Sequence, residues 1–171
     1  SSEARFVHVT RMEKSTFLLL IEELRAVGLQ DSRYVSANEK LMIFIHILIG
    51  NSQRDCCERF QHSLDTIHHV IHEIMEAILL LSDKLMIEPK INDPVAERIS
   101  SDPRFFPYFD GCIGAIDGTH ISCVPPSDNQ GPFRNRKGFL SQNVLAACNF
   151  DMTFSYVLAG WEGSAHDGRI L

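Results

Sequence analysis

Apolar and polar positions recur at two different periods along the chain. Within residues 1–90 the apolar positions follow steps of three and four, which predicts helices. The first predicted helix covers residues 17–27. Thr10 and Glu13 have the spacing of a capping box before it, and Gly28 is its expected stop.

The next predicted helix is apolar on nearly all sides. Ser36 and Glu39 form a second capping box at the start of "EKLMIFIHILI", and Gly50 follows the apolar run. A helix without a polar face has no side for solvent. We therefore expect this helix to be buried.

A third long helix is predicted to start at Ser63 and to carry a narrow apolar seam as far as Leu81. A short helix at 52–60 and the polar turn "QHS" precede it, an order compatible with a helix-turn-helix that reads a major groove. The alternative is a plain helical packing unit, because residues 50–72 carry fewer cations than carboxylates.

Beyond Pro89 and Pro94 the period changes from that of helices to that of strands. After a short helix in "PVAERIS", the segment "CIGAIDGTHISCV" alternates at period two. "QNVLAACNF" and "TFSYVLAG" predict two more strands with a tight connection between them. We expect an α+β protein with an all-α domain at 1–90 and a second domain at 91–171.

Composition narrows the classes of function. The 171 residues hold 16 Lys and Arg against 22 Asp and Glu, a net charge of −6, which argues against holding a polyanion by bulk charge. No apolar stretch reaches the length of a membrane span, so no membrane partner is expected. The five cysteines lack CxxC spacing, which argues against a disulfide framework or a zinc ribbon.

A single carboxylate, Asp117, interrupts the first predicted strand. Asp-Gly between alternating apolar residues is a hairpin signal, so Asp117 and Gly118 have a turn as one interpretation. The other is a carboxylate placed on a strand to bind a divalent cation, which needs further ligands. Asp167 is a second candidate, at the start of a helix that Ser164 can cap, and its alternative is an acid that interacts with the helix dipole.

Three segments resemble the PIF/Harbinger transposases and their domesticated nuclease-like relatives. They are "GCIGAIDGTHI", "FRNRKGFLSQNVLAACNFDMTFSYVLAGWEGSAHDGRIL" and "EKLMIFIHILIGNSQRDCCERFQHSLDTIHHVIHEI". The resemblance covers about residues 36–171. It implies a helix-turn-helix-like N-terminal domain followed by part of a ribonuclease H-like α/β catalytic domain.

In that family three acidic residues, a DDE or DDD triad, hold Mg²⁺ or Mn²⁺. Asp117 matches the first acid and Asp167 the second, so the resemblance implies that both are catalytic metal ligands. The third acid is expected beyond Leu171, and these 171 residues by themselves are therefore expected to be an incomplete and inactive nuclease.

Cationic residues and histidines lie close to the two acids in the sequence. Arg134, Arg136 and Lys137 supply local positive charge, for which we expect contact with DNA phosphates, with a solvated loop as the alternative. His120 and His166 stand beside the acids. They can help to position water or phosphate, or they can be ordinary hydrogen-bonded histidines.

The implied function is a transposon-derived DNA endonuclease or transposase that cleaves phosphodiester bonds with two divalent ions. The alternative is a domesticated, non-catalytic module for interaction with DNA or protein. The resemblance further implies a nuclear location, DNA and a separate Myb-like DNA-binding protein as partners, and a homo-oligomer, since transposases commonly act as multimers.

Overall fold

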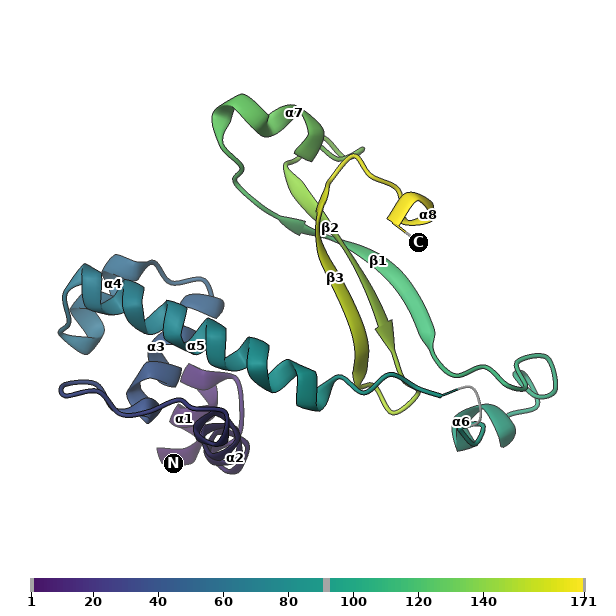
Figure 1. Cartoon of the computed structure of the whole chain (residues 1–171), viewed down its shortest axis with the longest axis horizontal. Helices are drawn as coiled ribbons and strands as arrows, with labels where there is room; N and C mark the ends of the chain where they lie inside the picture. The colour runs from purple at the N-terminus through teal and green to yellow at the C-terminus, as the bar shows by residue number, and fades with distance from the viewer. Residues whose placement is uncertain (1, 91–92, 171) are drawn as a thin grey trace. The chain divides into compact units, whose positions relative to one another are not determined.

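The computed structural model describes residues 2–90 and 93–170, with the side chains of Ser2, Asp167 and Ile170 outside the described part. The chain forms two compact units, Ser1–Lys84 and Leu85–Leu171, so the division falls a few residues before the prolines that mark it in the sequence. Figure 1 shows helices in the first unit and a sheet in the second. This mixture of helices with an antiparallel sheet agrees with the α+β class.

The described residues of the first unit form five helices: α1 (Ser2–Thr10), α2 (Lys14–Ala26), α3 (Ala37–Leu48), α4 (Gln53–Phe60) and α5 (Leu64–Leu85). Ser36 caps α3 as expected, since its hydroxyl accepts a hydrogen bond from the backbone N–H of Glu39 at 3.2 Å. Gly28 and Gly50 follow α2 and α3 with positive φ of 111° and 101°, which confirms both predicted stops.

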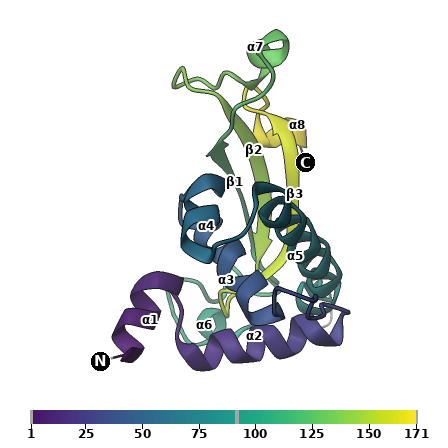
Figure 2. The same ribbon diagram turned by 90° about the vertical axis from the view of Figure 1, so that its left-hand side faces the viewer.

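The predicted capping box of Thr10 and Glu13 is wrong. Thr10 ends α1, and its hydroxyl donates 2.9 Å to the carbonyl of Phe6 in the last turn of that helix. Glu13 is the N-cap of α2, but its side chain makes no capping hydrogen bond. The backbone turns sharply between the two helices, where Arg11 has a φ of 58° (Figure 2). The hydroxyl of Thr10 thus closes one helix instead of opening the next.

The helical unit holds the larger apolar core. Leu24, Leu41, Ile43, Ile67 and Ile74 are at most 1% exposed, and they come from α2, α3 and α5. The prediction that α3 is buried is confirmed for most of its length. The narrow seam of α5 is also confirmed, because the residues that it buries follow steps of three and four.

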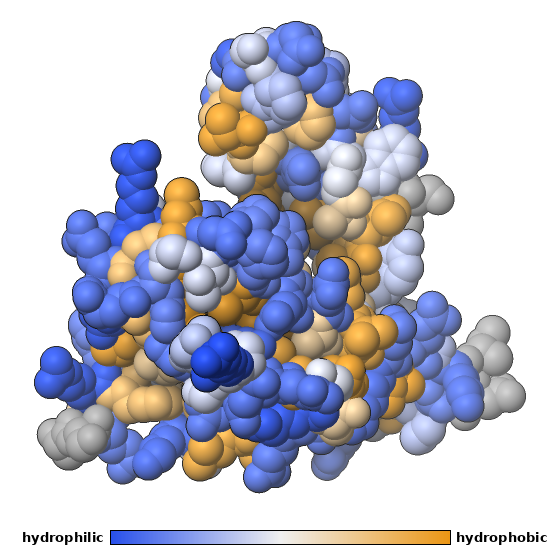
Figure 3. All heavy atoms as spheres, turned by 60° about the vertical axis from the view of Figure 1, so that its left-hand side comes forward, coloured by the Kyte–Doolittle hydropathy of each residue, from blue (hydrophilic) through white to orange (hydrophobic). Residues whose placement is uncertain are grey.

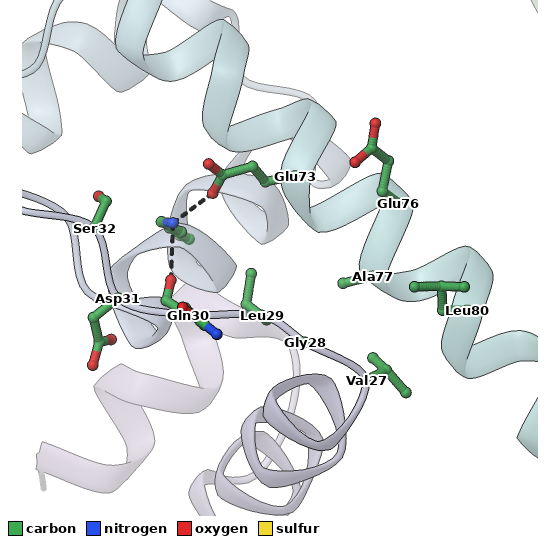
Figure 4. A pocket seen from close by; sticks show the side chains of 11 residues that line it. Val27, Gly28, Leu29, Gln30, Asp31, Ser32, Glu73, Glu76, Ala77 and Leu80 are labelled. Carbon is green, nitrogen blue, oxygen red and sulfur yellow. Dashed lines mark hydrogen bonds and ion pairs between the residues drawn. The ribbon is translucent and has the colours of Figure 1, made fainter.

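One cation lies inside this core. The side chain of Lys40 in α3 is 4% exposed, and its ammonium donates to the carboxylate of Glu73 in α5 at 2.5 Å and to the carbonyl of Gln30 at 2.9 Å (Figure 4). A buried charge is tolerated only when it is paired and hydrogen-bonded. Lys40 therefore joins α3, α5 and the 28–32 loop beside a cavity of about 380 Å³.

The second unit is built on three antiparallel strands in the order β1-β2-β3: β1 (Ala115–Ser122), β2 (Ser141–Cys148) and β3 (Phe154–Glu162). Asp117 pairs with Ala146 and His120 with Asn143. The tight connection between β2 and β3 is confirmed, with Met152 at a φ of 72°. Short helices complete the unit: α6 (Glu97–Ser100), the 3-10 turn η1 (Ser127–Asn129), α7 (Gln130–Phe133) and α8 (Asp167–Ile170).

Apolar side chains reach the surface as well as the core. Figure 3 shows them as orange areas between polar residues. On α5 the most exposed apolar side chains are Leu79 at 66% and both Leu80 and Leu85 at 58%. Among the described helices, none combines the length and the hydropathy that crossing a bilayer requires.

Candidate functional site

Asp117 lies in the middle of β1 rather than in a turn. Asp117 and Gly118 pair with Ala146 and Leu145 of β2, so the hairpin interpretation is wrong. Asp117 is exposed, and its Oδ1 accepts a hydrogen bond from the backbone N–H of Gly118 at 2.9 Å. The strand thus presents a carboxylate to solvent from an otherwise largely apolar sequence, at a position where no turn requires it.

Asp167, the second predicted acid, comes five residues after the end of β3 in the sequence. The backbone of Asp167 begins α8, which contacts β2, and α7 and α8 both lie at the end of the sheet away from the β2–β3 turn (Figure 1). The carboxylate of Asp167 is outside the described part of the structure. Within the described residues, no three His, Cys, Asp or Glu side chains form a cluster that could hold a metal ion.

A cavity of about 440 Å³ gathers four of the predicted site residues: His120, Arg136, Lys137 and His166. Three segments, 118–120, 135–139 and 163–166, line it together with Asn143 of β2. None of the described lining residues is acidic. In a chain with a net charge of −6, the cavity is therefore a local basic site.

The side chains of Asp117 and of His120, which lines the cavity, belong to opposite faces of β1. Successive strand residues point to alternate faces, and His120 is three positions from Asp117. Gly118 lines the cavity and directly follows Asp117 in the chain. Asp117 is thus not among the residues that line the cavity, although its neighbour Gly118 is.

Buried polar side chains hold the cavity walls together. The hydroxyl of Ser141 is within hydrogen-bond distance of the amide of Asn135 at 2.9 Å and of Nδ1 of His120 at 3.1 Å. Ser141 is 0% exposed and Asn135 is 6% exposed, so the contact between these two residues is shielded from water. One hydroxyl of β2 therefore links the cationic loop to a histidine of β1.

A second buried amide holds the segment that leads to Asp167. Nδ2 of Asn143, a residue that is 1% exposed, donates to the carbonyl of Ala165 at 3.1 Å. Gly163 lies so close to β2 that a Cβ there would be 2.5 Å from the carbonyl oxygen of Ser141. Asn143 and Gly163 therefore hold residues 163–166, which directly precede Asp167, against β2.

The three cations of the loop have different surroundings. Arg136 contacts the ring nitrogens of His166, and both residues line the cavity with Lys137. The guanidinium of Arg134 instead donates to the carbonyl of Gly138 at 2.6 Å, and Arg134 is not among the lining residues. Arg136 and Lys137, two of the three cations for which phosphate contact was predicted, thus line the cavity, whereas Arg134 stabilises the loop.

Several lining or supporting residues were not predicted from the sequence, among them Asn135, Phe139, Ser141 and Asn143. A polar residue within a strand normally indicates the solvent face, and that signal pointed outward for Ser141 and Asn143. Phe139 had a usable signal, because an aromatic residue within three positions of two cations is a common arrangement in nucleic-acid-binding loops.

Comparisons with known proteins give two family matches. Residues 116–171 match the family described as "DDE superfamily endonuclease". Residues 1–80 match a family described as "Domain of unknown function (DUF8040)". No solved structure matches the chain.

A curated relative points in the same direction as the first match. It is the Rattus norvegicus protein named "Putative nuclease HARBI1", which is 34% identical over 61 residues. That alignment covers 36% of this chain and 18% of the relative. The resemblance to Harbinger transposase-derived nucleases is thus confirmed by a relative and by the match of residues 116–171 to the DDE superfamily of endonucleases.

Proposed function

We propose that the chain is part of a divalent-metal-dependent DNA endonuclease or transposase, in which Asp117 and Asp167 are metal ligands. The observation that carries the proposal is the exposed carboxylate of Asp117 within β1, in the segment that matches the endonuclease family. The three-stranded sheet is then the first part of a ribonuclease H-like domain, and α3 to α5 form the helix-turn-helix-like part.

The donor atoms suit the proposed ions. Carboxylate oxygens are the ligands that Mg²⁺ and Mn²⁺ prefer, and the Asp117 side chain is open to solvent. Two such ions, when bound, activate an attacking oxygen and stabilise the leaving oxygen of an in-line phosphoryl displacement. Asp117 and Asp167 act as ligands in this scheme and transfer no proton.

The cationic cavity supplies the substrate contacts. Arg136 and Lys137 are exposed, so both can reach the phosphates of a DNA strand that lies over β1. His166 and His120 can donate hydrogen bonds to the same phosphates or to water. Arg134 contributes by closing the loop, through its hydrogen bond to Gly138.

Metal binding to the folded chain tests the proposal. Manganese titration, followed by electron paramagnetic resonance, is expected to show binding that Asp117→Asn weakens by at least about tenfold, because loss of mere supporting residues already costs that much. Asp128→Asn is the matched control, an exposed aspartate in η1 outside the cavity. Equal Mn²⁺ affinity in the two variants would contradict the role of Asp117.

A non-catalytic interaction module is the second candidate. The exposed Leu79 and Leu80 on α5 favour it, since apolar side chains in contact with solvent are common at protein interfaces. The proposed partner is a Myb-like DNA-binding protein in the nucleus. Co-precipitation of that partner is expected to survive Asp117→Asn and to be lost in Leu79→Gln/Leu80→Gln, and the opposite pattern would argue against this candidate.

Two further properties belong to the proposal. A fluorescent fusion is expected to accumulate in the nucleus. Sedimentation equilibrium of the chain is expected to show a homo-oligomer. A monomer at all concentrations would contradict the proposed oligomer.

A further inference from the structure

The cavity beside β1 has the size and lining of a pocket for one small ligand. Its volume of about 440 Å³ falls within the range of roughly 300–1,000 Å³ that is usual for such pockets. Asn135, Asn143 and Ala165 in its lining are at most 8% exposed, and Gly163 is buried with them. Its exposed lining residues carry the positive charge. A phosphate group resting on a flat surface would need no such depth.

The exposed lining residues also offer an aromatic ring. Phe139 is 40% exposed and lines the cavity beside Lys137 and Arg136. Exposed aromatic rings next to cations are the usual platform for nucleic-acid bases, because every base has a face that stacks on a ring while the cations hold the phosphates. An apolar ring left in contact with water within a basic cavity fits such a partner better than it fits phosphate alone.

The backbone that carries the ring is fixed before any ligand binds. The N–H of Asn135 donates to the carbonyl of Phe139 at 3.0 Å, and the side chain of Asn135 accepts from the N–H groups of Lys137 and Phe139. Gly138 provides the positive φ of 85° that the turn requires. A platform ordered in advance loses little conformational entropy on binding.

We propose that this cavity binds a single unpaired nucleotide of the DNA strand, with its phosphate on Arg136 and Lys137 and its base against the ring of Phe139. The proposal rests on the proposed function, because it takes DNA as the substrate. A base inside the cavity cannot also be paired, so the preferred substrate is a single strand or a duplex from which one nucleotide is extruded.

The position of β1 gives this pocket a role in the reaction. Gly118 lines the cavity, and Asp117, the residue before it in β1, faces the opposite side from His120. A nucleotide held in the cavity therefore brings the neighbouring phosphodiester to the edge of β1, where glycine offers no side chain as an obstacle. The pocket then sets which phosphodiester lies beside Asp117.

Binding of short labelled oligonucleotides to the whole chain tests the proposal without metal. Fluorescence anisotropy in the presence of EDTA compares a single strand with the same strand in a duplex. The single strand is expected to bind more tightly. Phe139→Ala is expected to weaken single-strand binding by about 5- to 100-fold, the loss that corresponds to one base stacked on one ring.

Three variants separate the ring from the charge. Phe139→Leu keeps an apolar side chain without a ring and is expected to lose nearly as much affinity as Phe139→Ala. Phe154→Ala, at an aromatic residue of β3 that is 59% exposed, is the matched control and is expected to bind like the unchanged protein. Lys137→Gln is expected to weaken single strand, duplex and competing inorganic phosphate alike.

The outcomes distinguish this inference from the proposed function. Equal affinity for single strand and duplex, with no effect of Phe139→Ala, would overturn the nucleotide pocket even if Lys137→Gln lowers both affinities. Binding that none of these substitutions changes would place DNA elsewhere and would also overturn it. Either result leaves the manganese titration of Asp117→Asn as the separate test of the metal site.

Discussion

The pair of Lys40 and Glu73 allows a prediction about the stability of the helical unit. Glu73→Ala leaves an ammonium group that is 4% exposed with the carbonyl of Gln30 as its hydrogen-bond partner. Removing one partner of a fully buried pair costs about 3–5 kcal/mol. Glu73 itself is 49% exposed, so water can reach its place, and we expect the lower cost of about 1–3 kcal/mol for an underpaired buried group.

Removing the charge instead of its partner should be less harmful. Lys40→Met keeps most of the apolar stem and leaves Glu73 in water, so the expected cost is about 1 kcal/mol, from the unpaired carbonyl of Gln30. The double variant Lys40→Met/Glu73→Ala is therefore expected to be more stable than Glu73→Ala alone. A cavity effect would give the opposite order, because the double variant removes more atoms.

Urea unfolding measures these differences. Far-UV circular dichroism follows the helical unit, and the fluorescence of Trp161, the single tryptophan, follows the sheet. Glu23→Ala is the matched control, because its pair with Lys84 is exposed at 43% and 59% and should contribute below about 1 kcal/mol. The reasoning is refuted if Glu73→Ala costs no more than Glu23→Ala, or if the double variant is the least stable.

Three further predictions concern other contacts. Gly163→Ala should abolish the native Trp161 fluorescence by displacing residues 163–166, whereas Gly168→Ala, with open space around the added Cβ, should leave it unchanged. Asn143→Ala should lower the free energy of unfolding by about 1–3 kcal/mol in the urea transition that Trp161 fluorescence follows, and should speed hydrogen exchange in residues 163–166. The N–H of Ala37 and the guanidinium of Arg25 hold the pKa of Asp31 below its usual 3.8, so stability present at neutral pH is lost as pH falls below that value, and Asp31→Asn should flatten this acid-induced loss.

The fold was predictable where one period ran over a long segment. The apolar steps of three and four placed α2, α3 and α5, the period-two alternation placed β1, and two strand-like runs with a tight connection placed β2 and β3. The α1 helix was missed because "SEARFVHVT" includes β-branched residues with weak helix propensity and no seam. Its last residue, Thr10, also has the side chain of an N-cap, and only the contact with Phe6 shows which helix it serves.

The candidate site was predictable only in its cationic residues and histidines. Arg136, Lys137, His120 and His166 come to one cavity, as their positions near the two acids suggested. Whether Asp117 lies in a turn or in a strand was not predictable, because the Asp-Gly pair fits both equally well in sequence. Pairing with Ala146 across the sheet decides between them, and this contact depends on chain far from Asp117.

Ser141 connects the register of a strand to the geometry of a binding cavity. Its hydroxyl and the amide of Asn143 occupy alternate positions on one face of β2, so a shift of one residue would turn both to the other face. An insertion at 124–126, ahead of η1, would only lengthen a loop, whereas an insertion inside β2 would separate the cationic loop from His120. Tolerance to insertions should therefore change abruptly where β2 begins.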